Sequence, residues 1–341
     1  MLRIVILCVL LSCLPALSAR AADPCMRLAA PDAQDVRGRI AAAACEEHRL
    51  WYRPFIESDG RIGFVPVREG QRERLANGQP AWQRVIEYWR GSGLLWQAGA
   101  GDCSQVDPVS PTCRAFVLDT PWSAAFVSWV MQRAGLPAFS GSSSHLGYVR
   151  RAYREPLLNP YRVSSPGTGE VGVGDMLCSV RGGNRIYGFG ELASLLSGNE
   201  PGLGMHCDIV VGKSVREGAW YAYLIGGNVL DSVTMRELPL SPGGRFAHLP
   251  MRSAGDPECT PESRHVCDLN RQDWSVLLQL RPDSELAALR PAMPAQIGDS
   301  RPGRYPAAPA AGQPGAAAPE RPRCCNHCDP EVGLPRCPAG P

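Results

Sequence analysis

The chain has 341 residues, and 44% of them are hydrophobic, so it can bury a substantial core in one or two domains. Its formal net charge at pH 7 is only +2, which argues against the broad positive surface of a nucleic-acid-binding protein. After the N-terminal segment, no apolar run reaches the roughly 18 residues that a membrane-spanning helix needs.

Residues 1–22 are predicted to be a signal peptide. Arg3 precedes an apolar run from Ile4 to Leu17, and the small residues of Ala19–Ala21 offer a cleavage site of the A-x-A kind. The alternative is a lipoprotein signal with the lipid on Cys13, although the apolar run continues past this cysteine. We therefore expect an exported protein, either periplasmic or extracellular.

Cysteine usage agrees with export. Of the 14 cysteines, Cys8 and Cys13 fall in the signal peptide, which leaves twelve, an even number, in a compartment that permits disulfides. Three local pairs could each close a short loop, and a fourth pair lies on two neighbouring predicted strands: Cys25 with Cys45, Cys103 with Cys113, Cys259 with Cys267, and Cys178 with Cys207. Sequence does not fix connectivity, so these pairings are hypotheses.

Residues 23–119 are predicted to form a mostly helical N-terminal subdomain that packs on the core. Helices are expected from Asp35 to His48 and from Ala81 to Arg90. In the second helix, Trp82, Ile86 and Trp89 recur at helical spacing and indicate a buried face.

Residues 120–280 are predicted to be the core domain, which begins with a helix that carries Ser123 in its first turn. Thr120 is a suitable N-cap, Pro121 fits the first helical position, and Gly135 follows the last periodic residue as a C′ stop. Unpaired N–H groups at the start of a helix favour a developing negative charge. A nucleophile at Ser123 would gain from this position.

The rest of the core is predicted to be mainly a sheet. A helix near residues 146–154 is followed by segments of β-branched or alternating character, separated by Gly, Pro and Asn turns. The expected strands are Met176–Val180, His206–Val215, Trp220–Ile225, Ser232–Leu238 and Ser275–Leu280. A helix packed on an antiparallel sheet is an α+β arrangement.

The Ser123 helix resembles the nucleophile segment of CHAP and NlpC-type amidases and endopeptidases, a branch of the papain-like cysteine hydrolases. In that family a cysteine stands where this chain has Ser123. The resemblance continues in Gly174–Leu177, which is similar to a strand start, and in His206–Val211, which is similar to the strand that opens with the catalytic histidine. Ile225–Asn228 resembles the segment that bears the third polar residue.

This resemblance covers residues 115–240 and implies a papain-like core of a nucleophile-bearing helix on an antiparallel sheet. It implies Ser123 as the nucleophile, His206 as base and then acid, and Asn228 as the residue that orients the histidine ring. The implied reaction is acyl transfer to Ser123 during cleavage of amide or peptide bonds in peptidoglycan or another envelope substrate. The serine version of the motif also resembles an uncharacterised family of exported bacterial proteins.

Three further residues are weaker candidates for substrate contact: Trp122, His145 and Asp208. The alternative for His145 is a solvated loop position. Asp175 and Asp208 are alternatively expected to accept backbone hydrogen bonds near their strands. Cys207, which adjoins His206, is interpreted as structural because adjacent strand residues point to opposite faces.

Serine in place of cysteine leaves two functions open. A serine hydroxyl is not an anion at neutral pH, so it needs an aligned base and an oxyanion site during attack. The chain is therefore either a hydrolase adapted to serine or a catalytically degenerate module that binds the envelope or peptidoglycan through the same cleft. We expect neither a small-molecule cofactor nor a catalytic metal, because no phosphate loop precedes a helix and the histidines lack ligand spacing.

The composition changes after residue 280. Residues 281–323 are rich in Pro, Ala and Gly and are predicted to be a flexible linker. Residues 324–341 form a Cys-rich tail in which Cys324, Cys325, Cys328 and Cys337 could form two disulfides or, with His327, a zinc site. In an exported protein the disulfides are favoured.

Overall fold

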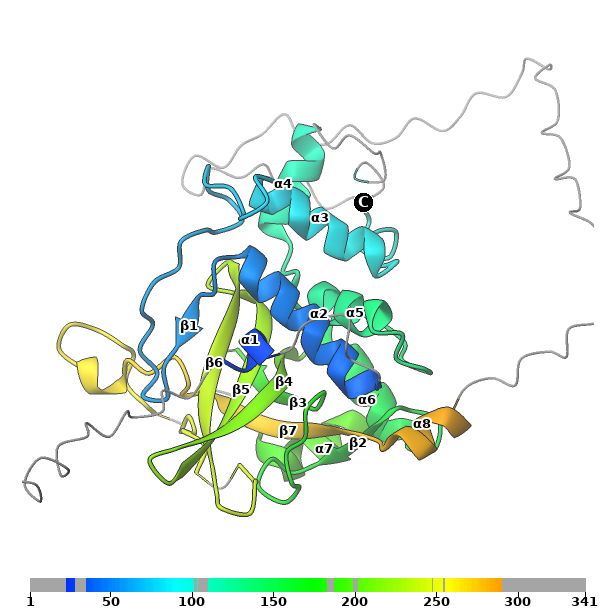
Figure 1. Ribbon diagram of the computed structural model, residues 1–341, viewed down its shortest axis with the longest axis vertical. Helices are drawn as coiled ribbons and strands as arrows, with labels where there is room; N and C mark the ends of the chain where they lie inside the picture. The colour runs from blue at the N-terminus through cyan, green and yellow to red at the C-terminus, as the bar shows by residue number, and fades with distance from the viewer. Residues whose placement is uncertain are drawn as a thin grey trace, which may run out of the picture. The chain divides into compact units, whose positions relative to one another are not determined.

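Among the residues that it describes, the computed structural model has a seven-stranded sheet in the order β1-β6-β5-β4-β3-β7-β2 (Figure 1). These residues are 23–27, 35–100, 103, 110–182, 187–198, 202–246, 248–253 and 255–289. Paired strands are antiparallel, except for the short parallel pair of β1 and β6. The strands are β1 (Phe55–Ile56), β2 (Tyr161–Ser164), β3 (Met176–Arg181), β4 (Gly204–Arg216), β5 (Ala219–Val229), β6 (Ser232–Leu240) and β7 (Asp273–Leu280).

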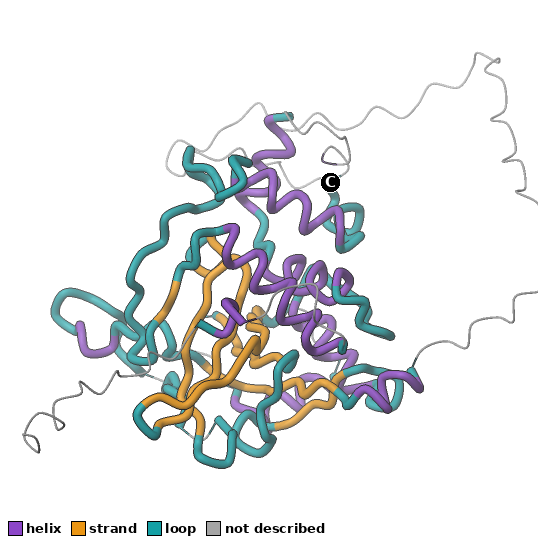
Figure 2. The backbone as a smooth tube through the Cα atoms, in the orientation of Figure 1, coloured by secondary structure: helices purple, strands orange, loops and turns teal. Residues whose placement is uncertain are grey.

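Helices pack against this sheet, so the predicted α+β class is confirmed (Figure 2). Helices α2 and α5 contact β4 and β5, α3 packs on α5, and α7 packs on β7. None of the helices in the described part of the chain combines the length and apolar character that a membrane crossing requires. The helices are α1 (Pro24–Arg27), α2 (Val36–Leu50), α3 (Ala81–Gly91), α4 (Pro111–Asp119), α5 (Ser123–Arg133), α6 (His145–Arg154), α7 (Gly188–Ser197) and α8 (Asp283–Ala288).

All four disulfide pairings proposed from the sequence are present: Cys25–Cys45, Cys103–Cys113, Cys178–Cys207 and Cys259–Cys267. The bond between Cys178 and Cys207 joins directly opposed residues of β3 and β4. Cys207 is therefore structural and is not a rival nucleophile. Multiple disulfides are compatible with an exported protein.

The start of α5 differs from the prediction, whereas its end agrees. Pro111 begins a separate helix, α4, and Thr120 is the C-cap of that helix instead of the N-cap of α5. Helix α5 begins at Ser123, after Trp122, without a side-chain cap. Its end is closed as predicted: Gly135 has φ +65°, and its N–H donates to the carbonyl of Gln132, an arrangement that favours glycine.

The N-terminal region is continuous with the core sheet. Strand β1 pairs with β6, and Arg37 of α2 donates to the carbonyl of Val173 at 2.8 Å. Arg37 also lies 3.6 Å from Asp175, whose carboxylate accepts the backbone N–H groups of Gly172 and Leu280, each at 2.8 Å. The prediction that Asp175 accepts backbone hydrogen bonds is confirmed.

The predicted linker begins with ordered structure. Residues 283–288 form α8, in which Leu286 is buried and Glu285 pairs with both Arg162 and Arg281. The prediction of a flexible linker is therefore wrong for residues 283–288, because one buried leucine and two ion pairs hold helix α8 in place. The predicted signal peptide, the rest of the linker and the Cys-rich tail lie outside the described residues.

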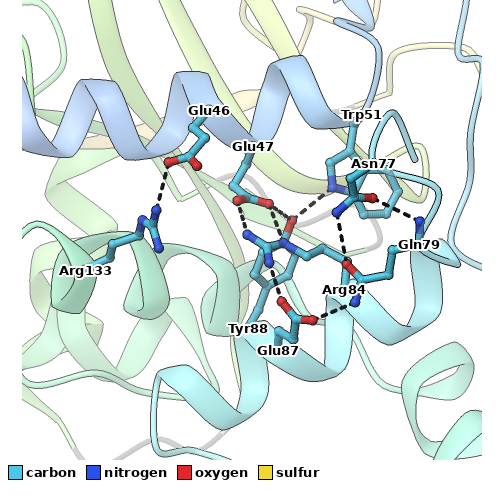
Figure 3. A network of polar contacts seen from close by, with 9 residues as sticks. All are labelled: Glu46, Glu47, Trp51, Asn77, Gln79, Arg84, Glu87, Tyr88 and Arg133. Atoms are coloured by element: carbon cyan, nitrogen blue, oxygen red, sulfur yellow. Dashed lines mark hydrogen bonds and ion pairs between the residues drawn. The ribbon is translucent and has the colours of Figure 1, made fainter. Parts of the chain in front are cut away.

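A buried ion pair joins α2 to α3 (Figure 3). The carboxylate of Glu47 is fully buried and accepts hydrogen bonds from the Arg84 guanidinium at 2.9 Å and from the Tyr88 hydroxyl at 2.5 Å. The indole N–H of Trp51 donates to the same hydroxyl at 2.9 Å. By contrast, the Arg133–Glu46 pair of the same region is about half exposed, with side-chain exposures of 49% and 45%.

We expect Arg84→Met to lower the free energy of unfolding by about 3–5 kcal/mol, because it leaves the Glu47 carboxylate buried without its counter-charge. Glu46→Gln, which breaks the exposed pair, is the matched control and should cost less than about 1 kcal/mol. Urea unfolding followed by tryptophan fluorescence measures both. Equal losses in the two variants would contradict the importance of the buried pair.

Candidate active site

Ser123 is the first residue of α5 and lies in a nearly closed site. Its side chain is 5% exposed, and its Oγ lies 2.6 Å from Nε2 of His145. Trp122, the N-cap, makes no side-chain hydrogen bond to the helix. The first N–H groups of α5 therefore lack a capping side chain and can stabilise a negative charge near Ser123.

His145, the first residue of α6, is the hydrogen-bond partner of Ser123. It is 3% exposed, so the alternative of a solvated loop histidine is wrong. One helical turn later, the Tyr148 hydroxyl hydrogen-bonds to Nδ1 of the same ring. Burial lowers the pKa of His145 well below its usual value, and the positive charges of His206 and Arg181 act in the same direction. The ring is therefore neutral at pH 7, the form that can accept a proton from Ser123.

His206 belongs to a second polar group. Its Nε2 lies 2.7 Å from Oδ1 of Asp208, two residues later on β4 and therefore on the same face of the strand. Arg236 of β6 donates to the other carboxylate oxygen at 2.7 Å. Burial by itself would raise the pKa of Asp208, but Arg236 and His206 hold this pKa well below its usual range.

The two groups meet at their histidines. The ring centroids of His145 and His206 are 5.2 Å apart, in an edge-to-face arrangement. His206 is 2% exposed, and its Nδ1 has no hydrogen-bond partner among the described residues. The structure thus brings Ser123, His145, His206 and Asp208 into one site. Within this site, Nδ1 of His206 has no hydrogen-bond partner among the described residues.

Asp208, and not Asn228, holds the ring of His206. Asn228 lies at an irregularity of β5 between Gly226 and Val229, with φ +56°. The role predicted for Asn228 is therefore taken by Asp208, because the two-residue period of β4 sets this carboxylate beside the histidine. The expectation that Asp208 accepts backbone hydrogen bonds is also wrong, since its oxygens bond to His206 and Arg236.

Two glycines of β5 let the site close. A Cβ atom on Gly226 would lie 1.8 Å from Oδ1 of Asp208 and 2.9 Å from Nε2 of His206. A Cβ atom on Gly227 would lie 2.6 Å from the Cβ of Phe126 and 2.8 Å from the Trp122 ring. Any larger residue at these positions would push β5 away from α5 or from the histidine.

Trp122 is part of the core and does not face a substrate. It is fully buried, and its ring stacks on Trp51 and Tyr88 with centroid separations of 5.7 Å and 5.5 Å. Its indole N–H donates to the carboxyl group of Glu69. The sequence-based expectation of a substrate contact at Trp122 is therefore wrong.

Glu69 is a buried acid beside the nucleophile segment. It is 6% exposed, and burial, reinforced by the charge of Asp231, raises its pKa to about 8. Glu69 lies 53 residues before Trp122 in the chain, and no local pattern marks it. Two further site residues were not predicted from the sequence. Tyr148 could have been predicted, because it follows His145 by one helical turn. Arg236 could not, because it comes from a strand that is distant in the sequence.

The described residues include no group of three or more His, Cys, Asp and Glu side chains placed to hold a metal ion.

We expect Gly226→Ala to separate Asp208 from His206 and to lower the free energy of unfolding by about 2–4 kcal/mol, because the new methyl group overlaps a buried carboxylate. Gly63→Ala is the control, since a Cβ atom there meets nothing within 4 Å. Chemical unfolding measures stability, and the NMR signals of His206 report the displaced ring. An unshifted His206 signal would contradict this contact.

We expect Glu69→Gln to remove a pH dependence of stability. A folded-state pKa of about 8, above the ordinary 4.5, means that this group stabilises the fold below about pH 4.5 and that its contribution is lost as the pH rises through 8. The variant should match wild type near pH 5 and exceed it by ~1–3 kcal/mol near pH 9. Urea unfolding at both pH values measures this, with the exposed Glu73→Gln as control. Parallel pH profiles would contradict it.

One known protein family matches the part of the chain that contains this site. A family model described as an uncharacterised protein conserved in bacteria (DUF2272) matches residues 76–280, more than half of the chain. The matched range contains Ser123, His145, His206 and Asp208. No curated protein and no solved structure matches the chain. The chain belongs to this family of uncharacterised proteins conserved in bacteria.

Proposed function

We propose that this protein is an exported hydrolase that transfers an acyl group to Ser123. The observation that carries the proposal is the 2.6 Å contact between the Ser123 Oγ and Nε2 of His145. A neutral histidine in contact with a serine at a helix start is the arrangement that nucleophilic catalysis requires.

In the proposed reaction, His145 takes the role of base that the family resemblance implied for His206. Nε2 of His145 accepts the hydroxyl proton while the Ser123 Oγ attacks the substrate carbonyl carbon. The N–H groups at the start of α5 stabilise the oxyanion. His145 then returns the proton to the leaving amine, and water hydrolyses the acyl-enzyme with the same histidine as base.

The second polar group supports the charge that this reaction creates. When His145 holds the proton it is a buried cation, and the negative charge of Asp208 partly offsets the lowering of its pKa by burial. Asp208 stays ionised because the positive charge of Arg236 stabilises its carboxylate. The guanidinium group of Arg236 is held in place by a hydrogen bond that it donates to the side-chain oxygen of Asn270 at 3.0 Å. His206 hydrogen-bonds to Asp208, and its ring lies edge to face against that of His145. Burial lowers the pKa of His206, so this ring is neutral at pH 7 and adds no positive charge beside His145.

The proposed substrates are amide or peptide bonds of the cell envelope, with peptidoglycan as the first candidate. The four disulfides support an oxidising compartment outside the cytoplasm. The resemblance of the Ser123, His206 and Ile225–Asn228 segments to CHAP and NlpC-type amidases and endopeptidases supports the substrate class.

One observation favours a second candidate, a catalytically inactive module that binds the envelope. Ser123 and His145 are 5% and 3% exposed, so a substrate carbonyl reaches the Oγ only after the surrounding side chains move. A site that stays closed to the reacting carbonyl would not catalyse, which leaves binding as its function.

We expect the exported protein to be labelled by a fluorophosphonate probe and to release fragments from peptidoglycan. Ser123→Ala and His145→Ala should each lower kcat/KM by roughly 10³-fold or more, because nucleophile and base act as one unit. Ser128→Ala, at another buried serine of α5 that hydrogen-bonds to Ser142, is the matched control and should remain active.

The outcomes separate the alternatives. Activity that survives His145→Ala but is lost in His206→Ala would return the base to His206. If the wild type is neither labelled nor active on peptidoglycan, yet sediments with it, the hydrolase is excluded and the binding module is supported. Thermal unfolding of each variant ensures that a lost activity is not a lost fold.

A further inference from the structure

A cavity of about 490 Å³ is lined by residues that differ from those of the Ser123 site. His206 is near the start of this strand, and Arg216, which lines the cavity, is its last residue. Arg216 lies ten positions after His206, which corresponds to roughly 30 Å of extended strand. The cavity shares no lining residue with the candidate active site, and its volume is in the range of small-molecule sites.

One wall of the cavity is an exposed tyrosine in a strained conformation. Tyr52 has φ +63° and Arg53 has φ +59°, where non-glycine residues are uncommon. They follow the end of α2, and the N–H of Arg53 donates to the carbonyl of His48 at 2.9 Å. Position 52 is the C′ site of this helix end, which glycine usually occupies.

Burial does not account for an aromatic side chain at this position. Tyr52 is 49% exposed, so its ring gains little from the core while its backbone bears the strain. Phe55 and Tyr223 line the same cavity. Tyr52 and the partly buried Phe55 provide apolar surface on which a ligand can stack, whereas Tyr223 is only 5% exposed.

The polar lining is balanced in charge. Two acidic residues, Asp23 and Glu237, and two basic residues, Arg53 and Arg216, line the cavity, and Arg216 pairs with Glu237 at 2.9 Å. An anion would meet the carboxylates and a cation would meet the guanidinium groups. The cavity therefore favours a ligand without net charge.

His48 adds an acceptor that the protein leaves unused. It is 1% exposed, its Nε2 bonds to the carbonyl of Pro54 at 2.8 Å, and its Nδ1 has no hydrogen-bond partner among the described residues. Burial lowers the pKa of His48 to about 4, so the ring is neutral at pH 7. With the proton on Nε2, Nδ1 can only accept a hydrogen bond, and because this atom is itself buried a ligand hydroxyl would bond to it only after the ring moves.

We propose that this cavity binds a neutral saccharide. The C–H faces of a sugar ring match the aromatic surfaces of Tyr52 and Phe55. Sugar hydroxyls both donate and accept, which fits a lining of carboxylates, guanidinium groups and one histidine acceptor. The cavity would hold a glycan while the reaction at Ser123 proceeds elsewhere, but its binding does not depend on that reaction.

Isothermal titration calorimetry of the exported protein tests the proposal with triacetylchitotriose and cellotriose as neutral probes. Binding of the first alone indicates an amino-sugar glycan, and binding of both indicates a general saccharide site. Inorganic phosphate and trilysine are the charged probes. Either a failure of both neutral probes to bind at millimolar concentrations or tighter binding of a charged probe would overturn the proposal.

Variants of Tyr52 separate ligand binding from structure. Tyr52→Gly removes the ring but suits the left-handed backbone, so Kd should rise by about tenfold or more while Tm is unchanged or higher. Tyr52→Phe should bind as wild type, and so should Trp96→Ala, at an aromatic side chain that is 73% exposed outside the cavity. Wild-type affinity in Tyr52→Gly would overturn the assignment. Ser123→Ala should keep wild-type Kd, so this result stands apart from the test of hydrolysis.

Discussion

The close approach of β5 to the first turn of α5 is the constraint on which the site depends. It is possible only because residues 226 and 227 are glycines: one fits against Asp208 and His206, and the other against Trp122 and Phe126. With β5 in this place, the helix start that carries Ser123 lies beside the sheet that carries His206. The Trp122 ring, stacked on Trp51 and Tyr88, then fixes the helix against α2 and α3.

Two buried carboxylates in different parts of the molecule are each paired with an arginine. Glu47 is matched by Arg84 between two helices, and Asp208 is matched by Arg236 between two strands. Each carboxylate is fully buried, so either one would be costly without its partner. In the second case the partner also has a chemical consequence, because it keeps Asp208 ionised beside the two histidines. Glu69 has no such partner in the described part of the chain, and burial correspondingly raises its pKa.

The proposed functions use both ends of one strand. β4 carries His206 near its start and Arg216 at its end, and it is the longest strand in the described part of the chain. A catalytic centre and a glycan site on one rigid element would keep a fixed separation. This arrangement suits a long, repetitive substrate that is held at one point and cut at another.

Much of the fold could be predicted from the sequence because its signals are local. Helical spacing in residues 81–90, alternating strands and the pairing of nearby cysteines all act over short distances, and the α+β class and four disulfides followed from them. The start of α5 could not be predicted correctly from the sequence. Thr120 has the character of an N-cap, but it is the C-cap of the preceding helix, which begins at Pro111.

The sequence by itself determined that Ser123 stands at a helix start and that His206 opens a buried strand. Only the tertiary structure decided which groups they contact. His145 reaches Ser123 because α6 packs beside β4, and Asp208 displaces Asn228 as the partner of His206 because Arg236, 28 residues away, stabilises a buried carboxylate there. Contacts between distant segments depend on how whole elements pack, and no short stretch of sequence contains that information.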